Sequence, residues 1–208
     1  MLEADKVGIH LGGRWLFRDM SLTLEAGEVV GISGDSGVGK STLARMLAGH
    51  LAPDEGEVRY GGRPAARRGP HPAQLVLQHP ERAVNPRWRI RRILAEAGAP
   101  EPSLLEALQI APSWLDRWPS ELSGGELQRV CIARALGPAT RVLIADEMTA
   151  MLDALTQAGI WRAALGVAQE RGLGVLAISH DEALLERICT RRLRWEELRG
   201  DATTVMMP

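Results

Sequence analysis

The chain contains few cysteines and no long apolar run, and each shortage excludes a class of protein. Its 208 residues include two cysteines, Cys131 and Cys189, too few and too scattered for a disulfide framework or a zinc site. We expect both to have packing roles in a reducing compartment. No stretch approaches about 18 consecutive apolar residues, so none is predicted to span a bilayer by itself.

An excess of charge of either sign is also missing. The 25 basic and 26 acidic residues give a formal net charge of −1 at pH 7, so no overall basic field favours nucleic acid as a partner. Residues 1–6 are acidic and lack the apolar stretch of a secretion signal, from which we expect a protein that is not secreted. The hydrophobic content of 45% and mean hydropathy of −0.09 are ordinary for a domain that buries a core.

Lysine is rare, and one of the two lysines occupies an informative position. Only Lys6 and Lys40 occur, and the other 23 of the 25 basic residues are arginines. A compact ammonium on a thin stem fits between phosphate groups where a planar guanidinium does not. The alternative is a lysine that stands beside glycines by chance. We interpret the segment around Lys40 as a phosphate-binding loop made of Gly34, Asp35, Ser36, Gly37, Val38, Gly39, Lys40, Ser41 and Thr42.

The residues around this loop provide the context that a phosphate-binding loop requires. Residues 29–32 are a buried-strand run, and residues 41–48 place apolar side chains on one helical face. The loop therefore joins a strand to a helix, whose first amides and positive dipole end face the phosphates. Residues 2–32 as a whole predict short β segments, residues 57–62 a hairpin arm and residues 75–78 a strand.

Strands and helices continue to alternate in the second half. Residues 141–146 and 174–179 are apolar runs of the kind buried in parallel sheets. Residues 87–111 have a helical period and predict a helical insertion between two α/β halves. Residues 154–170 predict a helix, and the pattern indicates an α/β fold with a mostly parallel core. The expected inward face of that helix includes Leu155, Ala158, Leu165 and Ala168.

A second glycine turn, residues 122–126, precedes the strand that ends in Asp146 and Glu147. Together with the phosphate loop, this turn resembles the signature of the ATP-binding cassette (ABC) ATPases, and the resemblance covers nearly the whole chain. It implies a P-loop NTPase cassette with a mostly parallel core sheet, an N-terminal antiparallel β subdomain and an inserted helical subdomain. We expect one domain over 1–208, with a nucleotide-binding core at approximately 1–78 and 130–208 and a helical subdomain, carrying the signature, at approximately 79–129.

The same resemblance implies hydrolysis of ATP with Mg²⁺. The phosphate loop would hold the phosphates, and Ser41, Gln78 and Asp146 would hold or orient the metal. Glu147 would be the general base, and His180 would contact the γ-phosphate. From the residues alone, Glu147 could instead cap a helix and Gln78 could be an ordinary polar strand end.

The signature turn is expected to act on a nucleotide bound to a second subunit. In the family, closure of two subunits supplies a second set of donors to ATP and expels water. Met148 departs from the family, which usually has proline there. Leu11 aligns where an aromatic residue stacks on adenine, and Trp15 could either replace that aromatic or serve in packing. Residues 191–208 lack the usual closing hairpin pattern. The residues expected at the partner's ATP are Ser123, Gly124, Gly125, Glu126 and Asp153.

Three segments are similar to the peptide and nickel importer branch, and most of all to its nickel-type ATPase subunit: residues 78–87, 127–136 and 155–160. This likeness implies nickel, a metal chelate or a peptide as cargo. It also implies a second ATPase subunit, identical or different, two membrane permeases and, indirectly, a substrate-binding protein. The chain would lie on the cytoplasmic face of the inner membrane, held by partners. The region of Gln78 and 82–95 would receive a permease helix.

Three other classes of protein are alternatives to an importer ATPase. A soluble ABC ATPase of a non-transport complex usually has tandem cassettes or long coiled-coil insertions. A small kinase would leave residues 122–126 unexplained, and an inactive binding module is disfavoured by Glu147 and His180. Arginines on the predicted insertion either are solvated or face a partner subunit: Arg87, Arg89, Arg91 and Arg92.

Overall fold

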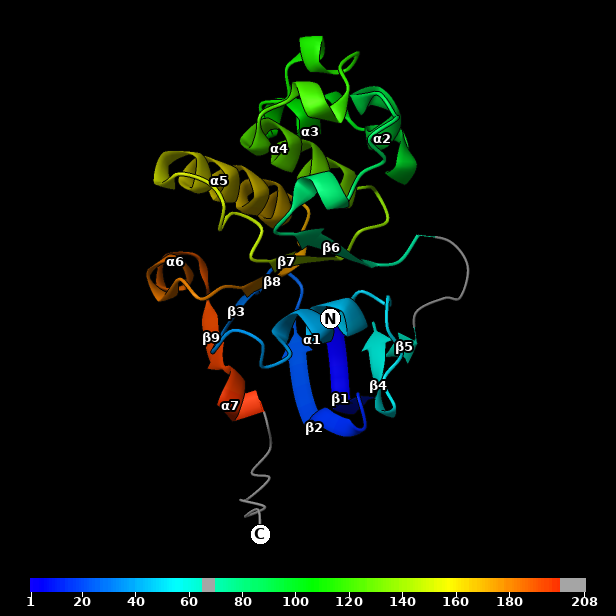
Figure 1. Ribbon diagram of the computed structural model, residues 1–208, viewed down its shortest axis with the longest axis vertical. Coiled ribbons are helices and arrows are strands. Elements are labelled where there is room, and N and C mark those ends of the chain that lie inside the picture. The colour runs from blue at the N-terminus through cyan, green and yellow to red at the C-terminus, as the bar shows by residue number, and fades with distance from the viewer. Residues whose placement is uncertain (65–69, 199–208) are drawn as a thin grey trace.

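The computed structural model describes residues 1–64 and 70–198, which form two sheets and a cap of helices (Figure 1). The first sheet is antiparallel and has the strand order β2-β1-β4-β5. The second has the order β6-β7-β8-β3-β9, and every neighbouring pair is parallel. The expected α/β fold with a parallel core sheet and an N-terminal antiparallel sheet is therefore confirmed. The strands are β1 (Leu2–Leu11), β2 (Arg14–Leu24), β3 (Val29–Ser33), β4 (Glu55–Tyr60), β5 (Arg63–Pro64), β6 (Ala73–Leu77), β7 (Val142–Asp146), β8 (Gly174–Ile178) and β9 (Arg191–Arg194).

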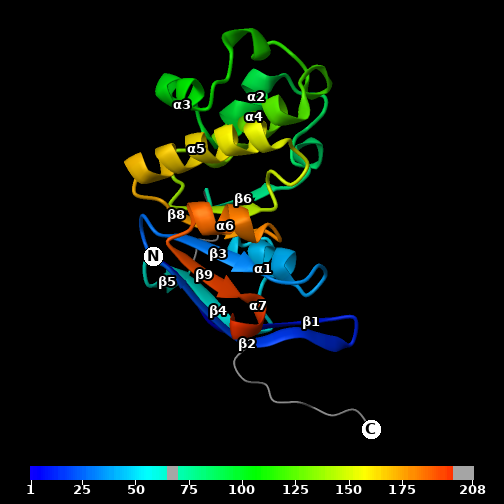
Figure 2. The same ribbon diagram turned by 90° about the vertical axis from the view of Figure 1, so that its left-hand side faces the viewer.

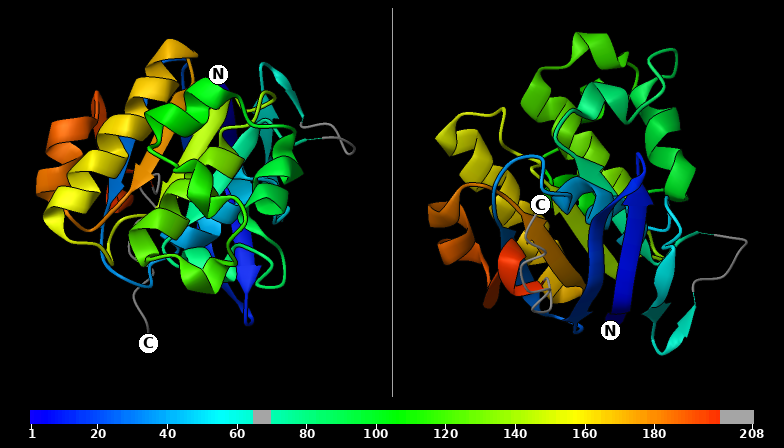
Figure 3. Two further views of the ribbon diagram at one scale, coloured as in Figure 1. Left: turned by 90° about the horizontal axis from the view of Figure 1, so that it is seen from above. Right: turned by 60° about the horizontal axis from the view of Figure 1, so that its bottom comes forward.

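The helices lie on both sides of the parallel sheet. Helix α1 lies on the side of the antiparallel sheet, whereas α2 to α5 cover the opposite side, as Figure 2 shows. Seen from above, α5 runs across the sheet beside the smaller helices (Figure 3, left). The helices are α1 (Lys40–Leu47), α2 (Ile90–Leu94), α3 (Pro102–Ala107), α4 (Gly124–Ala135), α5 (Ala154–Glu170), α6 (Glu182–Ile188) and α7 (Trp195–Leu198), with 3₁₀ turns at Pro80–Arg82, Ala95–Ala97, Pro112–Trp114 and Pro119–Glu121.

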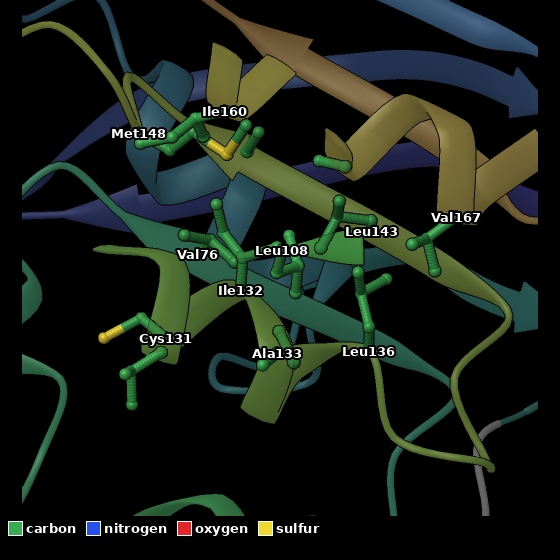
Figure 4. Packing of buried hydrophobic residues seen from close by; sticks show 14 of the residues in the cluster. Val76, Leu108, Cys131, Ile132, Ala133, Leu136, Leu143, Met148, Ile160 and Val167 are labelled. Carbon is green, nitrogen blue, oxygen red and sulfur yellow. The ribbon is translucent and has the colours of Figure 1, made fainter. Parts of the chain in front are cut away.

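Alternation along the strands divides the interior into two apolar clusters. Successive strand residues point to opposite faces of a sheet. In β7, Val142 and Ile144 join α1 and the antiparallel sheet in one cluster. Leu143 joins α4 and α5 in the other cluster, in which Figure 4 shows Leu143 among side chains from these helices. The parallel sheet is thus covered on both faces, which explains its continuous apolar strands.

The predicted helical segment 87–111 is interrupted in the structure. Only α2 and α3, with a 3₁₀ turn after α2, are helical within that range. Gly98 has a φ of 104°, a left-handed conformation that glycine adopts easily and that ends the helix. Pro100 and Pro102 follow, and proline is favoured only at a helix start. The predicted helical insertion is therefore built from short helices.

Helix α5 has the predicted bounds but a different buried face. Leu155 is 87% exposed, and Ala158 is also exposed, so these two assignments were wrong. Ala168 is buried and Leu165 packs partly buried against the core, as expected. The first turn of the helix is exposed, and its buried residues begin at Ile160. The face that it buries consists of Ile160, Trp161, Ala164, Val167 and Ala168.

Three further predictions concern the role of Cys131, the subdomain boundary at 129–130 and residues 191–208. Cys131 is buried in α4, and burial raises the pKa of its thiol to about 11, in keeping with a packing role. Helix α4 runs through the expected 129–130 boundary, so the proposed division into core and helical subdomain stays a prediction. Of residues 191–208, the structure describes β9 and α7, and residues 199–208 lie outside the described ranges. None of the described helices is long and apolar enough to cross a membrane.

Candidate functional site: the phosphate loop, the strand ends beside it and the signature turn

The phosphate loop joins β3 to α1 without a side chain that caps the helix. Gly39 occupies the N-cap position with a φ of 119°, which strongly favours glycine. Within the described residues, no side chain accepts a hydrogen bond from the first amides of α1. Those amides, and the positive end of the helix dipole, are therefore open to an anion.

Lys40 spans the loop from inside. Its Nζ donates hydrogen bonds to the carbonyl oxygens of Gly34 at 2.7 Å and Asp35 at 2.6 Å. The residue is only 6% exposed. A buried ammonium needs hydrogen-bond acceptors, and here the loop's own backbone supplies them. The ammonium thus stands at the inner edge of the loop, where phosphate oxygens could replace these carbonyls as acceptors.

A pocket of about 430 Å³ opens at this loop. It lies where the carboxyl ends of β3, β6 and β7 meet, which is the usual ligand site of parallel sheets. The structure therefore brings together most of the residues predicted to bind ATP and metal. Among the described residues, it is lined by Leu16, Ser36, Gly37, Gly39, Lys40, Ser41, Thr42, Gln78, Asp146 and Glu147. Gly34, Asp35 and Val38 belong to the same loop but do not line this pocket.

Asp146 is a buried carboxylate with an unused oxygen. It is 7% exposed, and its Oδ1 has no hydrogen-bond partner among the described residues. Burial raises the pKa of Asp146, while a hydrogen bond from Ser41 acts in the opposite direction. A carboxylate oxygen beside a serine hydroxyl is a donor set that suits a hard divalent cation such as Mg²⁺. The residues present therefore fit the metal that the sequence predicted.

Glu147 follows β7 in a strained conformation. Its φ is 49°, unusual for a residue with a side chain. Its amide donates to the carbonyl oxygen of Ile178 on β8 at 2.9 Å, which ties the turn to the neighbouring strand. The same neighbour relation brings His180 close, with 3.4 Å between His180 Nδ1 and Glu147 Oε1. The turn thus directs Glu147 into the pocket beside His180.

The signature turn lies apart from this pocket. Ser123 is the N-cap of α4, and its Oγ accepts a hydrogen bond from the Glu126 amide at 3.3 Å. The Glu126 carboxylate in turn accepts from the Ser123 amide at 2.7 Å, which completes a capping box. Ser123 and Gly124 are exposed, and neither lines the pocket at Lys40. The turn faces solvent.

The signature helix is locked to α5. A Cβ added to Gly125 would lie 2.9 Å from Cγ2 of Thr156, so only glycine allows this approach. Asp153 caps α5 by accepting from the amides of Leu155 and Thr156, and Thr156 Oγ1 donates to it as well. These bonds lower the pKa of Asp153. The starts of α4 and α5, which carry the predicted partner-facing residues, are therefore in contact.

The predicted adenine-stacking residue, Trp15, lies away from the phosphate pocket. It packs edge-on to His10, with ring centroids 5.3 Å apart, and under the Arg18 guanidinium at 4.8 Å. Its neighbour Leu16 lines the pocket instead. Adjacent strand residues face opposite ways, which explains the difference. Leu16 is an apolar strand residue that belongs to no motif, so sequence reasoning missed it.

Two other residues near the site carry no motif that sequence reasoning used. Thr149 is buried, and its Oγ1 accepts hydrogen bonds from Gln157 Nε2 and Trp161 Nε1, each at 3.0 Å. Gln128 of α4 is buried and donates to the carbonyl oxygen of Leu77 at 3.2 Å, next to Gln78. Both tie the pocket's strand ends to helices. The available signal is a polar residue at an otherwise apolar helix or loop position.

Three arginines of the helical region, Arg89, Arg91 and Arg92, have partners within the chain. The Arg89 guanidinium lies 4.4 Å from the ring centroid of Trp118, and Arg92 lies 4.0 Å from that of Trp88. Arg91 forms an ion pair with Asp116. These contacts hold the arginine side chains on an exposed surface of the helical region, where a partner can contact the solvent side of their charges.

Fold and pocket together define a nucleotide-binding α/β cassette with a phosphate loop at the carboxyl edge of its parallel sheet. The family description "ABC transporter" matches residues 17–150. The chain is also 40% identical over 195 residues to the "Nickel import ATP-binding protein NikE" of Shigella dysenteriae serotype 1 and of Escherichia coli strain K12, which covers 85% of this chain and 73% of each relative. The chain belongs to the ABC transporter family. It is an ATP-binding and ATP-hydrolysing subunit of an ABC transporter.

Solved structures of low sequence identity share the fold. An ATP-binding subunit of an ABC transporter superposes with a TM-score of 0.79 at 23% identity, covering 93% of this chain and 85% of that one. The dimeric structure of MJ0796, a bacterial ABC transporter cassette, gives 0.77 at 23% identity over 93% of this chain and 94% of that one. The structure of cbiO1 from Clostridium perfringens gives 0.78 at 23% identity, covering 93% and 83%. These likenesses confirm the cassette fold.

Proposed function

We propose that this chain is the ATPase subunit of an ABC importer for nickel, a metal chelate or a peptide, driven by ATP-dependent closure of two subunits. Relatives that are 40% identical are named for nickel import, which supports the nickel end of that range. A soluble ABC ATPase of a non-transport complex is the alternative. The observation that carries the dimer mechanism is the position of Ser123, exposed and outside the chain's own phosphate pocket.

In each subunit, the loop amides and Lys40 bind the ATP phosphates, and Ser41, Gln78 and Asp146 hold Mg²⁺. The metal, when bound, neutralises charge on the phosphates. Glu147 accepts a proton from the attacking water at its carboxylate. His180 contacts the γ-phosphate, and its Nδ1 lies 3.4 Å from Glu147 Oε1. Leu16 supplies an apolar wall at the outer side of the loop.

The second subunit completes the site. Its signature turn, with exposed Ser123 and Gly124 at the start of α4, approaches the γ-phosphate held by Lys40 of the first subunit. The positive end of a helix dipole favours an anion there. Asp153, exposed at the start of α5, lies on the same surface and contacts the partner's site. Closure replaces water around the phosphates with fixed donors, which favours the transition state.

The transport partners bind on the helical side. We propose that two permeases dock where Gln78 meets residues 82–95, because this region joins the ATP pocket to the helical part and has a basic surface. A substrate-binding protein would deliver the cargo to the permeases. The chain itself would lie at the cytoplasmic face of the inner membrane. Approximately residues 1–78 and 130–208 act as the nucleotide-binding core, and residues 79–129 act as the helical subdomain.

The first experiment traps the closed state. Glu147→Gln keeps the size and polarity of the side chain but removes the base, so the variant should bind ATP and accumulate as an ATP-loaded dimer. Size-exclusion chromatography with light scattering measures the dimer, and phosphate release measures hydrolysis. Unchanged hydrolysis in this variant would show that Glu147 is not the base.

The second experiment tests the signature turn. Ser123→Arg places a long cation where the partner's nucleotide should dock, so it should block closure while the isolated chain still binds ATP. Calorimetry on the monomer separates the two effects. Loss of ATP binding by the monomer would mean that the turn has a structural role within its own subunit. Uptake of radioactive nickel and of a labelled dipeptide, compared in cells with wild-type chain and Glu147→Gln, identifies the cargo class.

A further inference from the structure

The C-terminal strand and helix bring a tryptophan to the phosphate loop. Strand β9 pairs in parallel with β3, with Ser33 beside Arg194. The next residue on each strand leaves the sheet, so Trp195 and Gly34 lie next to each other. Figure 2 shows β9 and α7 in red beside β3, and the right-hand view in Figure 3 shows α7 beside the strands of the antiparallel sheet.

Trp195 touches the loop backbone at both of its ends. A Cβ added to Gly34 would lie 2.7 Å from the Cβ of Trp195, and one added to Gly39 would lie 3.2 Å from its Cζ2. Leu16 closes on Gly39 from another side, with Cγ 3.2 Å from the same added Cβ. Because glycine has no side chain, the indole contacts the main chain that carries the phosphate-facing amides.

The indole is held firmly from below the loop. Trp195 is 1% exposed, and its ring is edge-on to Phe17 of β2 with centroids 5.7 Å apart. Its Nε1 has no hydrogen-bond partner among the described residues, although it is buried. The ring therefore acts here through shape, since a buried donor without an acceptor costs free energy.

We propose that Trp195 is a positioning residue of the phosphate loop: its indole fixes the spacing of Gly34 and Gly39 and so aims the loop amides at the nucleotide phosphates. This inference rests on the proposed assignment of the ATP phosphates to the loop. Small displacements of such donors weaken phosphate binding because hydrogen bonds depend steeply on distance and angle. The segment from β9 to α7 thus takes part in nucleotide binding although no phosphate-binding motif lies in it.

The test compares two substitutions at this position. Trp195→Ala removes the ring, lets the loop relax and should raise the Kd for ATP about 10-fold, with a larger change in KM than in kcat. Trp195→Phe keeps an aromatic ring but lacks the indole Cζ2 that contacts Gly39, so its Kd should rise by about threefold, less than in Trp195→Ala. Calorimetry with MgATP below the melting transition measures both.

Leu2→Ala is the matched control, because Leu2 is fully buried in the same apolar cluster but lies on β1 away from the loop. It should lose stability without a change in Kd. Hydrogen exchange of residues 34–42 should accelerate in Trp195→Ala and stay at the wild-type rate in Leu2→Ala. If Trp195→Ala does not fold, Trp195→Leu takes its place with the same expected rise in Kd.

Two results would overturn the inference: wild-type Kd and wild-type exchange in the folded Ala or Leu variant, or an equal rise in Kd in Leu2→Ala. Lys40→Ala separates this failure from failure of the proposed function. If Lys40→Ala loses ATP binding while Trp195→Ala binds normally, only the role of Trp195 is wrong. If Lys40→Ala binds ATP as tightly as wild type, the assignment of the loop itself fails.

Discussion

The two glycine turns of this chain both begin a helix, but their polar groups are satisfied in opposite ways. At the phosphate loop, no described side chain caps α1, and Lys40 is bonded to the loop's own carbonyls. At the signature turn, Ser123 and Glu126 cap each other's amides. The first turn has open amides and a buried cation, whereas the second is stable by itself.

This difference indicates that the two turns have different roles in the proposed ATP site. An uncapped helix start with a lysine gains most from a bound anion, because the anion satisfies donors that the fold leaves open. A capped turn is stable without a ligand, so it can remain exposed until it binds the nucleotide of a partner subunit. The strand ends at Asp146 and Glu147 lie with the first turn, and Asp153 lies with the second.

The largest difference between the two turns is expected in ATP affinity, on substitution of Lys40→Ala. Loss of a charge-assisted bond to phosphate, worth up to about 3 kcal/mol, should weaken ATP binding on the order of 100-fold. Ser123→Ala, the counterpart at the capped turn, should leave ATP binding by the isolated chain at the wild-type level. Calorimetry on both variants measures this; similar losses would show that the turns do not differ in role.

Asp146→Asn should separate activity from stability. Hydrolysis should fall on the order of 100-fold because a metal-facing carboxylate is lost. Without nucleotide or metal, the free energy of unfolding should rise by about 1 kcal/mol, because burial disfavours the carboxylate and an amide carries no charge. Phosphate release and urea unfolding in EDTA measure the two effects. A less stable variant would contradict the account of this carboxylate.

Thr149→Val tests the link between the two surfaces. The variant keeps the shape but leaves the Gln157 and Trp161 donors without an acceptor, which loosens the segment between Glu147 and Asp153. We expect kcat to fall about 10-fold with an unchanged Kd for ATP. The control is Thr140→Val, which removes an equally buried hydroxyl bonded to the carbonyl oxygen of Ala135. An equal fall in kcat in the control would mean that only general stability matters.

The smallest effect is expected from Glu126→Ala. Removing one half of the capping box should cost about 1 kcal/mol of stability and leave ATP binding by the monomer unchanged. Glu121→Ala is a matched control, because the Glu121 carboxylate accepts from the Trp118 amide at 2.6 Å in the turn just upstream. Only Glu126→Ala should also slow hydrolysis by the dimer. Weaker ATP binding in the Glu126 variant would place its turn at the chain's own nucleotide.

Sequence patterns predicted the bounds of helices and strands well and their buried faces less well. Helix α5 has the predicted bounds because 154–170 is a long run of helix-forming residues capped by Asp153. Its buried face was wrong at Leu155, since the first turn of the helix faces solvent. Periodicity shows which residues share a face but not where the neighbouring layer stops. The same limit applies to Trp15 and Leu16, which adjoin in sequence and differ in facing the pocket.

The amino-acid sequence by itself determined the phosphate loop, the acidic strand end and the signature turn, because their backbone conformations and charges depend on glycine, lysine and carboxylate at fixed local spacing. Only the tertiary structure decided that Trp195 supports the loop and that Thr149 ties Glu147 to α5. These contacts join residues that are distant along the chain or lie on different elements, and they depend on strand register and helix placement. Such contacts arise only when the two sheets and the helices pack together.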